Sequence, residues 1–317
     1  MKVLVVRFSS IGDIVLTTPV LRCLHTQVPG VEIHYLTKKS FVGLLEHNPY
    51  VHKIWGLDSD FGELMKQLRS EKFDFIVDLH NNLRSKRVSL TLLIPYKRVN
   101  KLNWQKWRLV KLKQDAMPDV HIVDRYLDVA QKFNVQNDDK GLDFFVPPDT
   151  QLPAELPSDF VCFAIGGQHQ TKKLPIKKMI ELCNGISSLV VLIGGKEDVE
   201  AGAKIQNHCN RVLDLSGKLS INQSALVIKN ATTVISHDTG MMHIAAAYKK
   251  KVISIWGNTV PQFGMYPYKA SPDSVMFEVP DLSCRPCSKI GYESCPKGHF
   301  NCMNLQDVEK IAAEINS

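Results

Sequence analysis

Hydrophobic runs alternate with segments of helical periodicity along most of the chain. Short apolar runs predict strands at residues 3–6, 32–36, 51–57 and 73–79. Helical patterns separate these runs, in a segment that carries Leu16, Val20, Leu21 and Leu24 and at 40–48 and 61–71. This order of strand and helix predicts a parallel sheet with helices on both of its faces.

The alternation stops at a proline-rich stretch, Pro147 to Asp159, and then resumes. Four Pro in this stretch favour a linker over a helix or strand. Later strands are expected at 160–166, 189–195, 211–217, 232–238 and 251–258, and helices at 176–186, 198–209 and 305–316. The last helix places Leu305, Val308, Ile311, Ala312 and Ile315 on one face. We therefore predict two α/β domains, at 1–150 and 151–303, and a C-terminal helix within 304–317.

The chain has 317 residues, a net charge of +7 and a pI of about 8.9. This excess of positive charge favours phosphates, nucleic acid or an anionic membrane surface as partners, without choosing among them. No segment approaches the ~20 apolar residues of a membrane span. The four apolar residues before Arg7 are too few for a signal peptide. The pattern predicts a cytoplasmic protein without a membrane anchor of its own.

The first strand leads into the loop "SSIGD", residues 9–13, and then into a helix. This is the place where α/β proteins bind phosphates, but the loop carries the acid Asp13 and a single glycine, Gly12. A carboxylate repels phosphate and can instead accept a proton as a general base. Ligands in such folds sit at the carboxyl ends of strands, so this acid is expected to face an interdomain cleft.

The stretch "ISHDTGMMHIAAA", residues 235–247, also follows an apolar strand and opens a helix. The N–H groups at a helix N-terminus bind anions such as pyrophosphate, with Thr239 and Gly240 at the turn. Asp238 or Thr239 as an ordinary helix cap is an equal alternative. His243 lies one turn into the helix, where a lone histidine is more often packed than catalytic.

Lysines and glycine pairs mark further strand ends in the second domain. Gly166 and Gly167 precede Lys172 and Lys173, and Gly194 and Gly195 end the next strand. A lysine here can offset the charge of a diphosphate leaving group. A solvated lysine pair is the alternative.

The basic run 97–113 contains seven Lys or Arg, with Trp104 and Trp107 among them. Three interpretations stay open: a solvated helix, which the run by itself favours, a nucleic-acid surface, or a site for an anionic lipid-linked substrate at the membrane.

Four cysteines near the C-terminus are spaced Cys284-x2-Cys287-x7-Cys295-x6-Cys302. Four thiolates within about 20 residues can bind a structural zinc ion. Four reduced thiols are the alternative, because disulfides are unusual in a reducing cytoplasm.

These motifs together resemble glycosyltransferase family 9, the heptosyltransferase family of lipopolysaccharide inner-core assembly. The resemblance rests on "RFSSIGDIVLTTPVL", "FDFIVDLHNNLRS", "KKLP", "SHDTGMMHIAAA" and "ISIWGNT", in this order. It implies a GT-B fold, in which two Rossmann-like α/β domains face an interdomain cleft. The N-terminal domain would bind the acceptor and the C-terminal domain an ADP-sugar. Transfer would invert the anomeric carbon and need no metal or other cofactor.

The resemblance also implies roles for single residues. Asp13 corresponds to the general base, and Lys172 to a lysine that contacts the donor phosphates, with Lys173 as a rival. Leu174 stands where the family usually has Trp. Asp238, Thr239 and Gly240 correspond to the diphosphate-binding motif. We add to the donor set Gly167, Gln168, Gly194, Gly195 and His243. The expected acceptor set is Arg7, Ser10, Gly12, Asp78 and Arg84.

The expected partners are an ADP-sugar and an anionic lipid-linked glycan, met at the cytoplasmic face of the inner membrane, with no nucleic acid. Two alternatives stay open. A nucleotide-sugar epimerase on the same fold would need no acceptor, and a non-catalytic anion or nucleic-acid binding protein would need no base.

Overall fold

The computed structural model describes residues 1–152 and 155–317 and divides them into two compact units. Unit 1 comprises residues 1–102 and 120–145, and unit 2 comprises 103–119 and 146–317. Segment 103–119 thus packs with the second unit, whereas the range 1–150 had grouped it with the first. The predicted linker includes residues 153–154, which lie outside the described residues.

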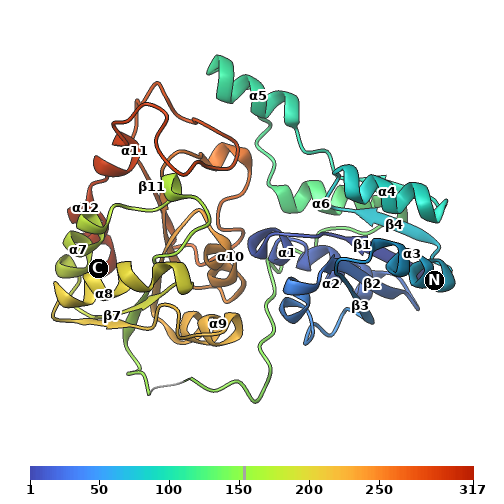
Figure 1. Ribbon diagram of the computed structural model, residues 1–317, viewed down its shortest axis with the longest axis horizontal. Coiled ribbons are helices and arrows are strands. Elements are labelled where there is room, and N and C mark those ends of the chain that lie inside the picture. The colour runs from blue at the N-terminus through green and yellow to red at the C-terminus, as the bar shows by residue number, and fades with distance from the viewer. Residues whose placement is uncertain (153–154) are drawn as a thin grey trace. The chain divides into compact units, whose positions relative to one another are not determined.

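Unit 1 is a five-stranded parallel sheet in the order β3-β2-β1-β4-β5 (Figure 1). The strands are β1 (Lys2–Val6), β2 (Glu32–Lys38), β3 (Lys53–Leu57), β4 (Phe75–Asp78) and β5 (Tyr96–Arg98). The helices are α1 (Ile11–Val15), α2 (Thr18–Gln27), α3 (Phe61–Ser70), α4 (Leu83–Leu92) and α6 (Ile122–Ala130), with 3-10 turns η1 (Lys39–Leu44) and η2 (Gln131–Phe133). Leu4 and Val6 of β1 pack with Leu64 and Leu68 of α3 in a buried core. The predicted parallel sheet is confirmed.

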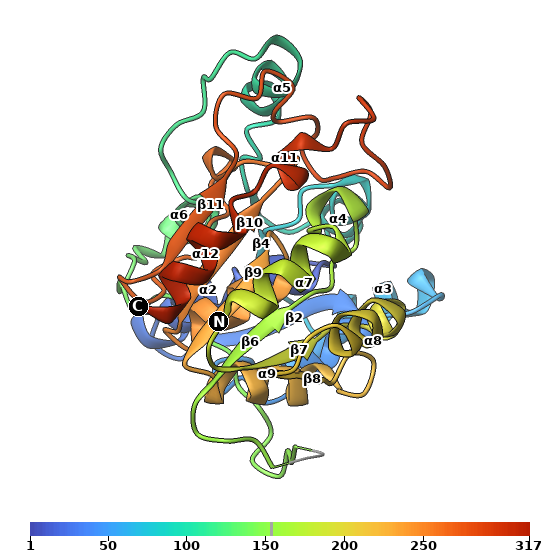
Figure 2. The same ribbon diagram turned by 90° about the vertical axis from the view of Figure 1, so that its left-hand side faces the viewer.

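Unit 2 is a six-stranded parallel sheet in the order β11-β10-β9-β6-β7-β8. Its strands are β6 (Phe160–Ala164), β7 (Leu189–Ile193), β8 (Val212–Asp214), β9 (Thr233–His237), β10 (Lys251–Trp256) and β11 (Val275–Glu278). Its helices are α5 (Asn103–Leu112), α7 (Ile176–Gly185), α8 (Val199–Asn207), α9 (Ile221–Asn230), α10 (Gly240–Ala247), α11 (Asn301–Asn304) and α12 (Val308–Asn316), with 3-10 turns η3 (Gln170–Lys172), η4 (Lys196–Asp198) and η5 (Pro261–Phe263). In Figure 2, α7, α8 and α12 lie in front of the strands, and their apolar side chains share one core with β6, β7, β9 and β10.

Three predicted helices differ from the structure. The first is split into α1 and α2, because Pro19 fits only the first turn of a helix and so begins a new one. The helix expected at 40–48 is the shorter 3-10 turn η1. Leu305 precedes the last helix and is 58% exposed, since α12 begins only after Asp307, whose carboxylate accepts from the Lys310 N–H.

No helix in the described ranges combines the length and the hydropathy that crossing a bilayer demands.

A buried ion-pair cluster fastens the end of unit 1 to its second helix. Arg22 of α2 is 3% exposed. Its guanidinium donates to both carboxylate oxygens of Asp138, at 2.7 and 2.8 Å, and also pairs with Asp143. These hydrogen bonds hold the pKa of Asp138 at about 2, against the effect of burial. The cluster joins segments more than 100 residues apart in the chain.

We expect Arg22→Met to lower the free energy of unfolding by about 2–4 kcal/mol, because two partly buried carboxylates would lose the guanidinium that they share. Chemical denaturation at pH 7 measures the loss. Lys39→Met is the matched control, since the Lys39 side chain is 72% exposed in its pair with Asp58 and its loss should leave the stability nearly unchanged. Equal effects of the two substitutions would contradict the assignment of this cluster.

Candidate active site

Each sheet has one place where the order of its strands reverses, and ligands of parallel α/β sheets bind at such switch points. In unit 1 this place lies between β1 and β4, and in unit 2 between β6 and β9. The connection after β1 leads into α1 with Asp13 in its first turn, and Asp238 and Thr239 follow β9 directly before Gly240 opens α10. The two strongest sequence motifs thus lie at the switch points of their own units.

Asp13 stands in the first turn of α1, held by two neighbours. One oxygen of its carboxylate accepts from the Ser10 N–H at 3.1 Å and from the Ser10 hydroxyl at 2.8 Å. The other lies 2.6 Å from Nη2 of Arg7. An acid in the first turn also suits the positive end of the helix dipole. Gly12 is buried within α1. The side chain of Asp13 keeps 21% of its surface exposed, so a ligand can reach it.

Arg7, which we had expected to bind the acceptor, is 8% exposed and committed to the protein. Besides Asp13, its guanidinium donates to the carbonyls of Ser9 at 2.8 Å and Leu79 at 2.6 Å and to the Tyr126 hydroxyl at 2.9 Å. The guanidinium of Arg7 is thus bound to Asp13 and to three other groups of the protein.

The electrostatics of Asp13 follow from this pairing. Burial raises the pKa of the carboxyl, but the Arg7 charge and the hydrogen bonds from Ser10 outweigh it and lower the pKa to about 2. Asp13 is therefore a carboxylate at every physiological pH, pointing in one fixed direction.

Asp78, also expected to bind the acceptor, is fully buried at the end of β4. Its carboxylate accepts from the N–H groups of His80 at 3.0 Å and Asn81 at 2.8 Å and from the Ser85 hydroxyl at 2.8 Å. It also pairs with Nε of Arg98 at 3.3 Å. Asp78 thus shapes the β4–α4 loop from inside, and the prediction that it contacts a ligand is not supported.

Sequence reasoning missed two groups near Asp13, namely His80 and Lys101. His80 packs edge-on against Phe8 at 5.2 Å between ring centroids. Burial, with the nearby cations, lowers the pKa of His80 to about 3, so its imidazole is neutral. Burial also lowers the pKa of Lys101. The charge of Arg7 lowers this pKa further, and the charge of Asp13 raises it. His80 lies within a quoted motif and Lys101 in the basic run, but only tertiary structure gathers them here.

Arg84, the remaining charged member of the expected acceptor set, lies at the start of α4 with its guanidinium 5.7 Å from the centre of the Phe8 ring. It therefore belongs to the same group of side chains as His80 and Asp13.

In unit 2, Lys172 and Asp238 form the centre of the expected donor site. Nζ of Lys172 lies 2.6 Å from Oδ2 of Asp238 and 3.1 Å from the Asp238 carbonyl oxygen. The hydroxyl of Thr259 donates to the same Oδ2 at 2.8 Å. An ammonium group has three N–H donors, and Asp238 accounts for two of them. The pair brings together loops that follow β6, β9 and β10.

The helix α10 begins directly beside this pair. Its N-cap Thr239 is extended and uses its hydroxyl toward Ser236 at 3.3 Å, not toward the helix. Gly167 permits the close approach of the β6 loop, because a Cβ there would lie 3.2 Å from Cγ2 of Thr239 and 3.3 Å from Cγ of Lys173. The first turn of α10 thus presents backbone N–H donors next to a lysine, which is a suitable arrangement for a diphosphate.

Lys173 has a different partner from Lys172. Its Nζ lies 3.2 Å from Oδ1 of Asp198, which is 1% exposed and was not predicted as a site residue. Oδ2 of Asp198 accepts from the Gly195 N–H at 3.0 Å, and a Cβ on Gly194 would come within 2.8 Å of Asp198. Asp198 therefore links the β6 and β7 loops.

Three further polar residues of unit 2, Gln168, His243 and His237, differ in how far they are exposed to solvent. Gln168 is exposed on the β6 loop, whereas His243 is buried in α10. His237 at the end of β9 was not singled out. Its Nε2 accepts from the Leu174 N–H at 3.0 Å, and burial lowers its pKa to about 3. His237 therefore fixes the "KKLP" loop that carries Lys172.

The C-terminal cysteines do not form the metal site that their spacing suggested. All four belong to the described residues, and no three of their sulfurs come within 4.8 Å of one another. Cys302 is 4% exposed in the core of unit 2, and Cys287 donates to the carbonyl of Cys284 at 3.2 Å. The Cys284 and Cys287 thiols remain neighbours, but the four cysteines do not converge on one point as a tetrahedral site requires.

A cluster of Glu32, His34 and His52 does meet that distance criterion in unit 1. Nδ1 of His34 accepts a hydrogen bond from Trp55 Nε1 at 3.1 Å, and an indole nitrogen is a donor only. The proton of the neutral imidazole must then sit on Nε2, the nitrogen that faces Glu32. A protonated nitrogen cannot ligate a metal, so this cluster does not fit one.

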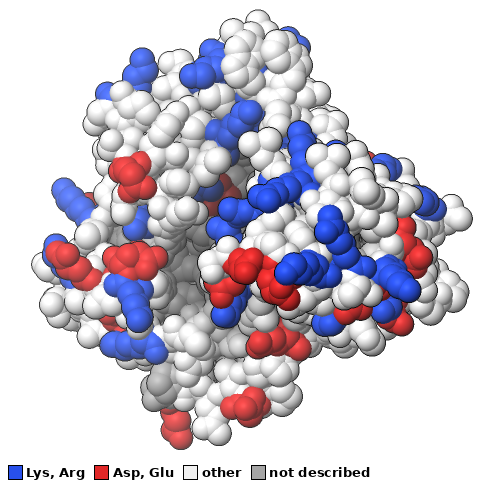
Figure 3. Space-filling model, turned by 45° about the vertical axis from the view of Figure 1, so that its right-hand side comes forward, with Lys and Arg blue, Asp and Glu red and all other residues white. Residues whose placement is uncertain are grey.

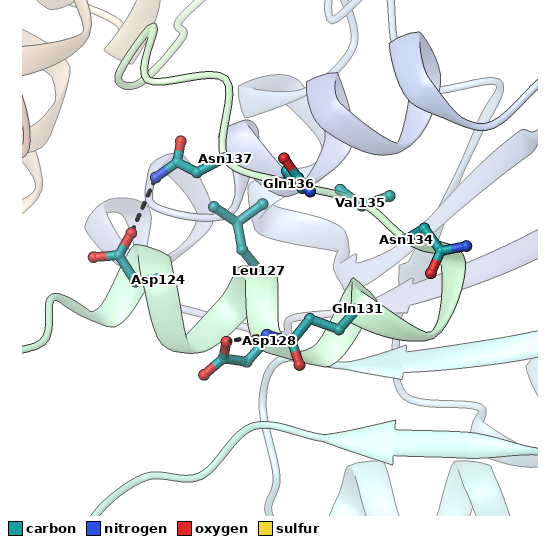
Figure 4. A pocket seen from close by; sticks show the side chains of 8 residues that line it. All are labelled: Asp124, Leu127, Asp128, Gln131, Asn134, Val135, Gln136 and Asn137. Carbon is teal, nitrogen blue, oxygen red and sulfur yellow. Dashed lines mark hydrogen bonds between the residues drawn. The ribbon is translucent and has the colours of Figure 1, made fainter.

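A pocket of unit 1 lies apart from these groups. A pocket of about 570 Å³ lies along α6 and the loop after it (Figure 4). Its lining residues are Asp124, Leu127, Asp128, Gln131, Asn134, Val135, Gln136 and Asn137. None of them belongs to either expected set of site residues.

Two units, each a parallel α/β sheet with polar loops at its switch point, are the architecture of the GT-B class of glycosyltransferases. The solved Escherichia coli ADP-heptose lipopolysaccharide heptosyltransferase II superposes with a TM-score of 0.72 at 20% identity, covering 99% of this chain and 98% of that one. This likeness confirms the predicted fold class.

Sequence comparison identifies the family. Glycosyltransferase family 9 (heptosyltransferase) matches residues 61–294, and the chain belongs to this family. It is 26% identical over 302 residues to lipooligosaccharide heptosyltransferase 2 of Haemophilus influenzae, covering 83% of this chain and 85% of the relative. Lipopolysaccharide heptosyltransferase 2 of Escherichia coli K12 is 23% identical over 303 residues, covering 83% and 84%. The protein is thus a glycosyltransferase, as its motifs predicted.

We expect Arg7→Gln to raise the pKa of Asp13 from about 2 to above about 3, because burial then acts with less opposition. Titration of the carboxyl carbon by NMR measures this change. A lowered folded-state pKa stabilises the protein above the unfolded value near 4, and this contribution is lost as pH falls through about 2. The variant should therefore show a shallower loss of stability between these values.

Arg84→Gln is the control for this titration. Arg84 contacts Phe8 and forms no ion pair with Asp13, so the pKa of Asp13 should stay near 2. An Asp13 that titrates in Arg7→Gln as it does in the wild type would refute the positioning role of Arg7.

Proposed function

We propose that this protein transfers a sugar, with heptose as the first candidate, from an ADP-sugar to a lipid-linked acceptor of the lipopolysaccharide inner core. The observation that carries the proposal is the contrast between the two switch points. A fixed carboxylate occupies that of unit 1, and a lysine beside a helix N-terminus occupies that of unit 2. The names of the relatives as lipopolysaccharide heptosyltransferases support this choice of donor and acceptor.

In this proposal unit 2 binds the donor diphosphate. Lys172 and the first N–H groups of α10 supply positive charge, and that charge counts most as the leaving ADP gains a negative one. Gly167 and Gly194 let Thr239 and Asp198 approach these loops closely, so the loops that would meet the nucleotide are compactly packed. An Escherichia coli heptosyltransferase of the same fold, with a TM-score of 0.68 at 18% identity, was solved with ADP. With these groups in place, the transfer needs no metal ion.

Asp13 is the proposed general base. The acceptor oxygen attacks the anomeric carbon, the bond from that carbon to ADP breaks, and Asp13 takes the hydroxyl proton. This single displacement inverts the anomeric carbon. A carboxylate with a pKa of about 2 is a weak base toward a free alcohol. It suffices here because an oxygen that is already bonding to the anomeric carbon becomes strongly acidic, so proton transfer accompanies bond formation.

The acceptor is proposed to bind beside Asp13 in unit 1. Arg84 and Lys101 offer positive charge to the phosphates or carboxylates of an anionic glycan. His80 is neutral and can exchange hydrogen bonds with sugar hydroxyls. Ser10 is occupied in holding Asp13. We propose that the protein works in the cytoplasm, against the inner face of the membrane where a lipid-linked acceptor resides.

Asp13→Asn should lower kcat by at least about 100-fold and leave the Kd for ADP within about twofold, because the amide cannot take the proton and lies in the other unit from the donor site. Release of ADP from ADP-heptose with purified acceptor measures kcat, and calorimetry measures the Kd. Asp58→Asn, on an exposed side chain, is the control.

Turnover of Asp13→Asn within tenfold of the wild type would remove Asp13 as the base. Conversion of the nucleotide-sugar without any acceptor would instead favour the epimerase alternative.

Lys172→Met should weaken binding of ADP by about 10- to 100-fold, because a charge-assisted hydrogen bond to phosphate is lost. Lys173→Met is the matched control and should change it by less than about threefold, since Lys173 is bound to Asp198. The ADP-induced shift of the thermal midpoint measures both. The opposite order of effects would transfer the phosphate role to Lys173.

A further inference from the structure

The positive charge of the protein comes from one segment. Residues 79–114 contain 10 of the 39 Lys and Arg residues and none of the 32 Asp and Glu residues. The rest of the chain has 29 cations against 32 acids, a net charge of −3. Lys and Arg side chains gather on the face that Figure 3 shows. The proposed transfer uses only Arg84 and Lys101 of this segment, so most of its charge has no role yet.

The helix α5, in the middle of the basic run, docks on unit 2 by one face. Leu109 is buried and packs with Val260 and Phe263, and Val110 joins the same cluster. Nζ of Lys113 donates to the carbonyls of Cys284 at 3.0 Å and Pro286 at 2.7 Å. The loop that contains the cysteines is thus one of the supports of α5.

The opposite face of α5 is apolar as well. Trp104 is 64% exposed, Trp107 39% and Leu112 49%. The two indole rings stack at 5.0 Å between centroids, with an angle of 11° between their planes. Residues 104, 107 and 111 follow the i, i+3, i+7 spacing of one helix face, so Lys111 stands beside the indoles. Arg108 is adjacent on the same side.

This second apolar face decides between the open interpretations of the basic run. A solvated helix would present polar side chains outward, but α5 exposes two tryptophans and a leucine. A nucleic-acid surface stacks each base on an open indole face, whereas here each indole has one face covered by the other ring. Leu112 adds aliphatic surface that bases do not require. Tryptophan and leucine flanked by Lys and Arg are typical of a helix in the interface of an anionic bilayer.

We infer that α5 seats the protein on an anionic phospholipid bilayer. Trp104, Trp107 and Leu112 enter the boundary between headgroups and acyl chains, and Arg108 and Lys111 pair with lipid phosphates. This inference deepens the proposed function, because a lipid-linked acceptor is reached from a membrane. It names the element that makes the contact, which lies outside the five motifs quoted above.

The test uses the full-length protein and vesicles of phosphatidylcholine with about one-third phosphatidylglycerol. Trp104→Ala with Trp107→Ala should lower the partition coefficient in co-sedimentation at least about tenfold. Arg108→Gln with Lys111→Gln should lower it by about fivefold for each charge and weaken its dependence on salt. Vesicles of phosphatidylcholine alone should bind the wild type weakly.

Lys66→Gln with Lys204→Gln is the matched control, because it removes the same charge from exposed side chains of α3 and α8. We expect it to bind vesicles within about twofold of the wild type. A drop as large as that of the α5 charge variant would reduce the effect to net charge and overturn the inference.

Tryptophan fluorescence gives an independent readout. The chain has four tryptophans, of which Trp55 and Trp256 are 7% and 1% exposed. A blue shift with anionic vesicles, and quenching by lipids brominated on the acyl chain, therefore report insertion of Trp104 and Trp107. Binding without either signal would overturn the insertion of α5.

Activity on an acceptor glycan freed of its lipid separates this inference from the proposed function. The Trp104 and Trp107 double variant should turn over the lipid-free glycan at the wild-type rate and lose rate only on acceptor in vesicles. Failure of the wild type with every glycan would contradict the proposed function, whatever the vesicles show. Two results would overturn the inference. If the double variant lost turnover on lipid-free glycan but bound vesicles normally, α5 would be a glycan contact. If the wild type bound nucleic acid in place of vesicles, α5 would be a nucleic-acid surface.

Discussion

Parallel pairing of every strand is the constraint on which the rest of this structure depends. Parallel strands put all their carboxyl ends at one edge of a sheet, so loops from distant parts of the sequence meet there. In unit 1 the loops after β1 and β4 meet because those strands are neighbours, although 68 residues separate Asp78 from Ser10. In unit 2 the loops after β6 and β9 meet in the same way and bring Lys172 to Asp238.

Buried charges then give these loops their shapes. Arg7, Asp78 and Asp198 form their hydrogen bonds with backbone groups and with other residues of the two sites. A buried charge is tolerated only when hydrogen bonds or ion pairs satisfy it. The same hydrogen bonds hold the backbone segments that they contact in place. The side chains that remain accessible, such as Asp13 and Lys172, are therefore presented by rigid supports and need little ordering when a ligand binds.

The basic segment shows how one stretch of sequence can serve two purposes. Lys101 belongs to the surroundings of Asp13, whereas Leu109 and Lys113, within the next twelve residues, attach α5 to unit 2. The helix α5 is apolar on two faces. One face is buried against unit 2, and the other stays exposed and can bind a partner. The cysteine-bearing loop, which lacks the geometry of a metal site, supports α5 through the contacts of Lys113.

The sequence by itself determined most of the strands, their parallel pairing, the family and the placing of Asp13, Lys172 and Asp238 after strands, because apolar periodicity and motifs at strand ends are local signals. The short strands β5 and β11 were not predicted. Only the tertiary structure decided that Arg7 and Asp78 are internal supports, that His80 and Lys101 lie near Asp13, and that the four thiols do not converge on one point. Those outcomes depend on contacts such as that of Arg7 with Tyr126, 119 residues along the chain. Burial and ion pairing belong to the packed molecule, and no local pattern of residues records them.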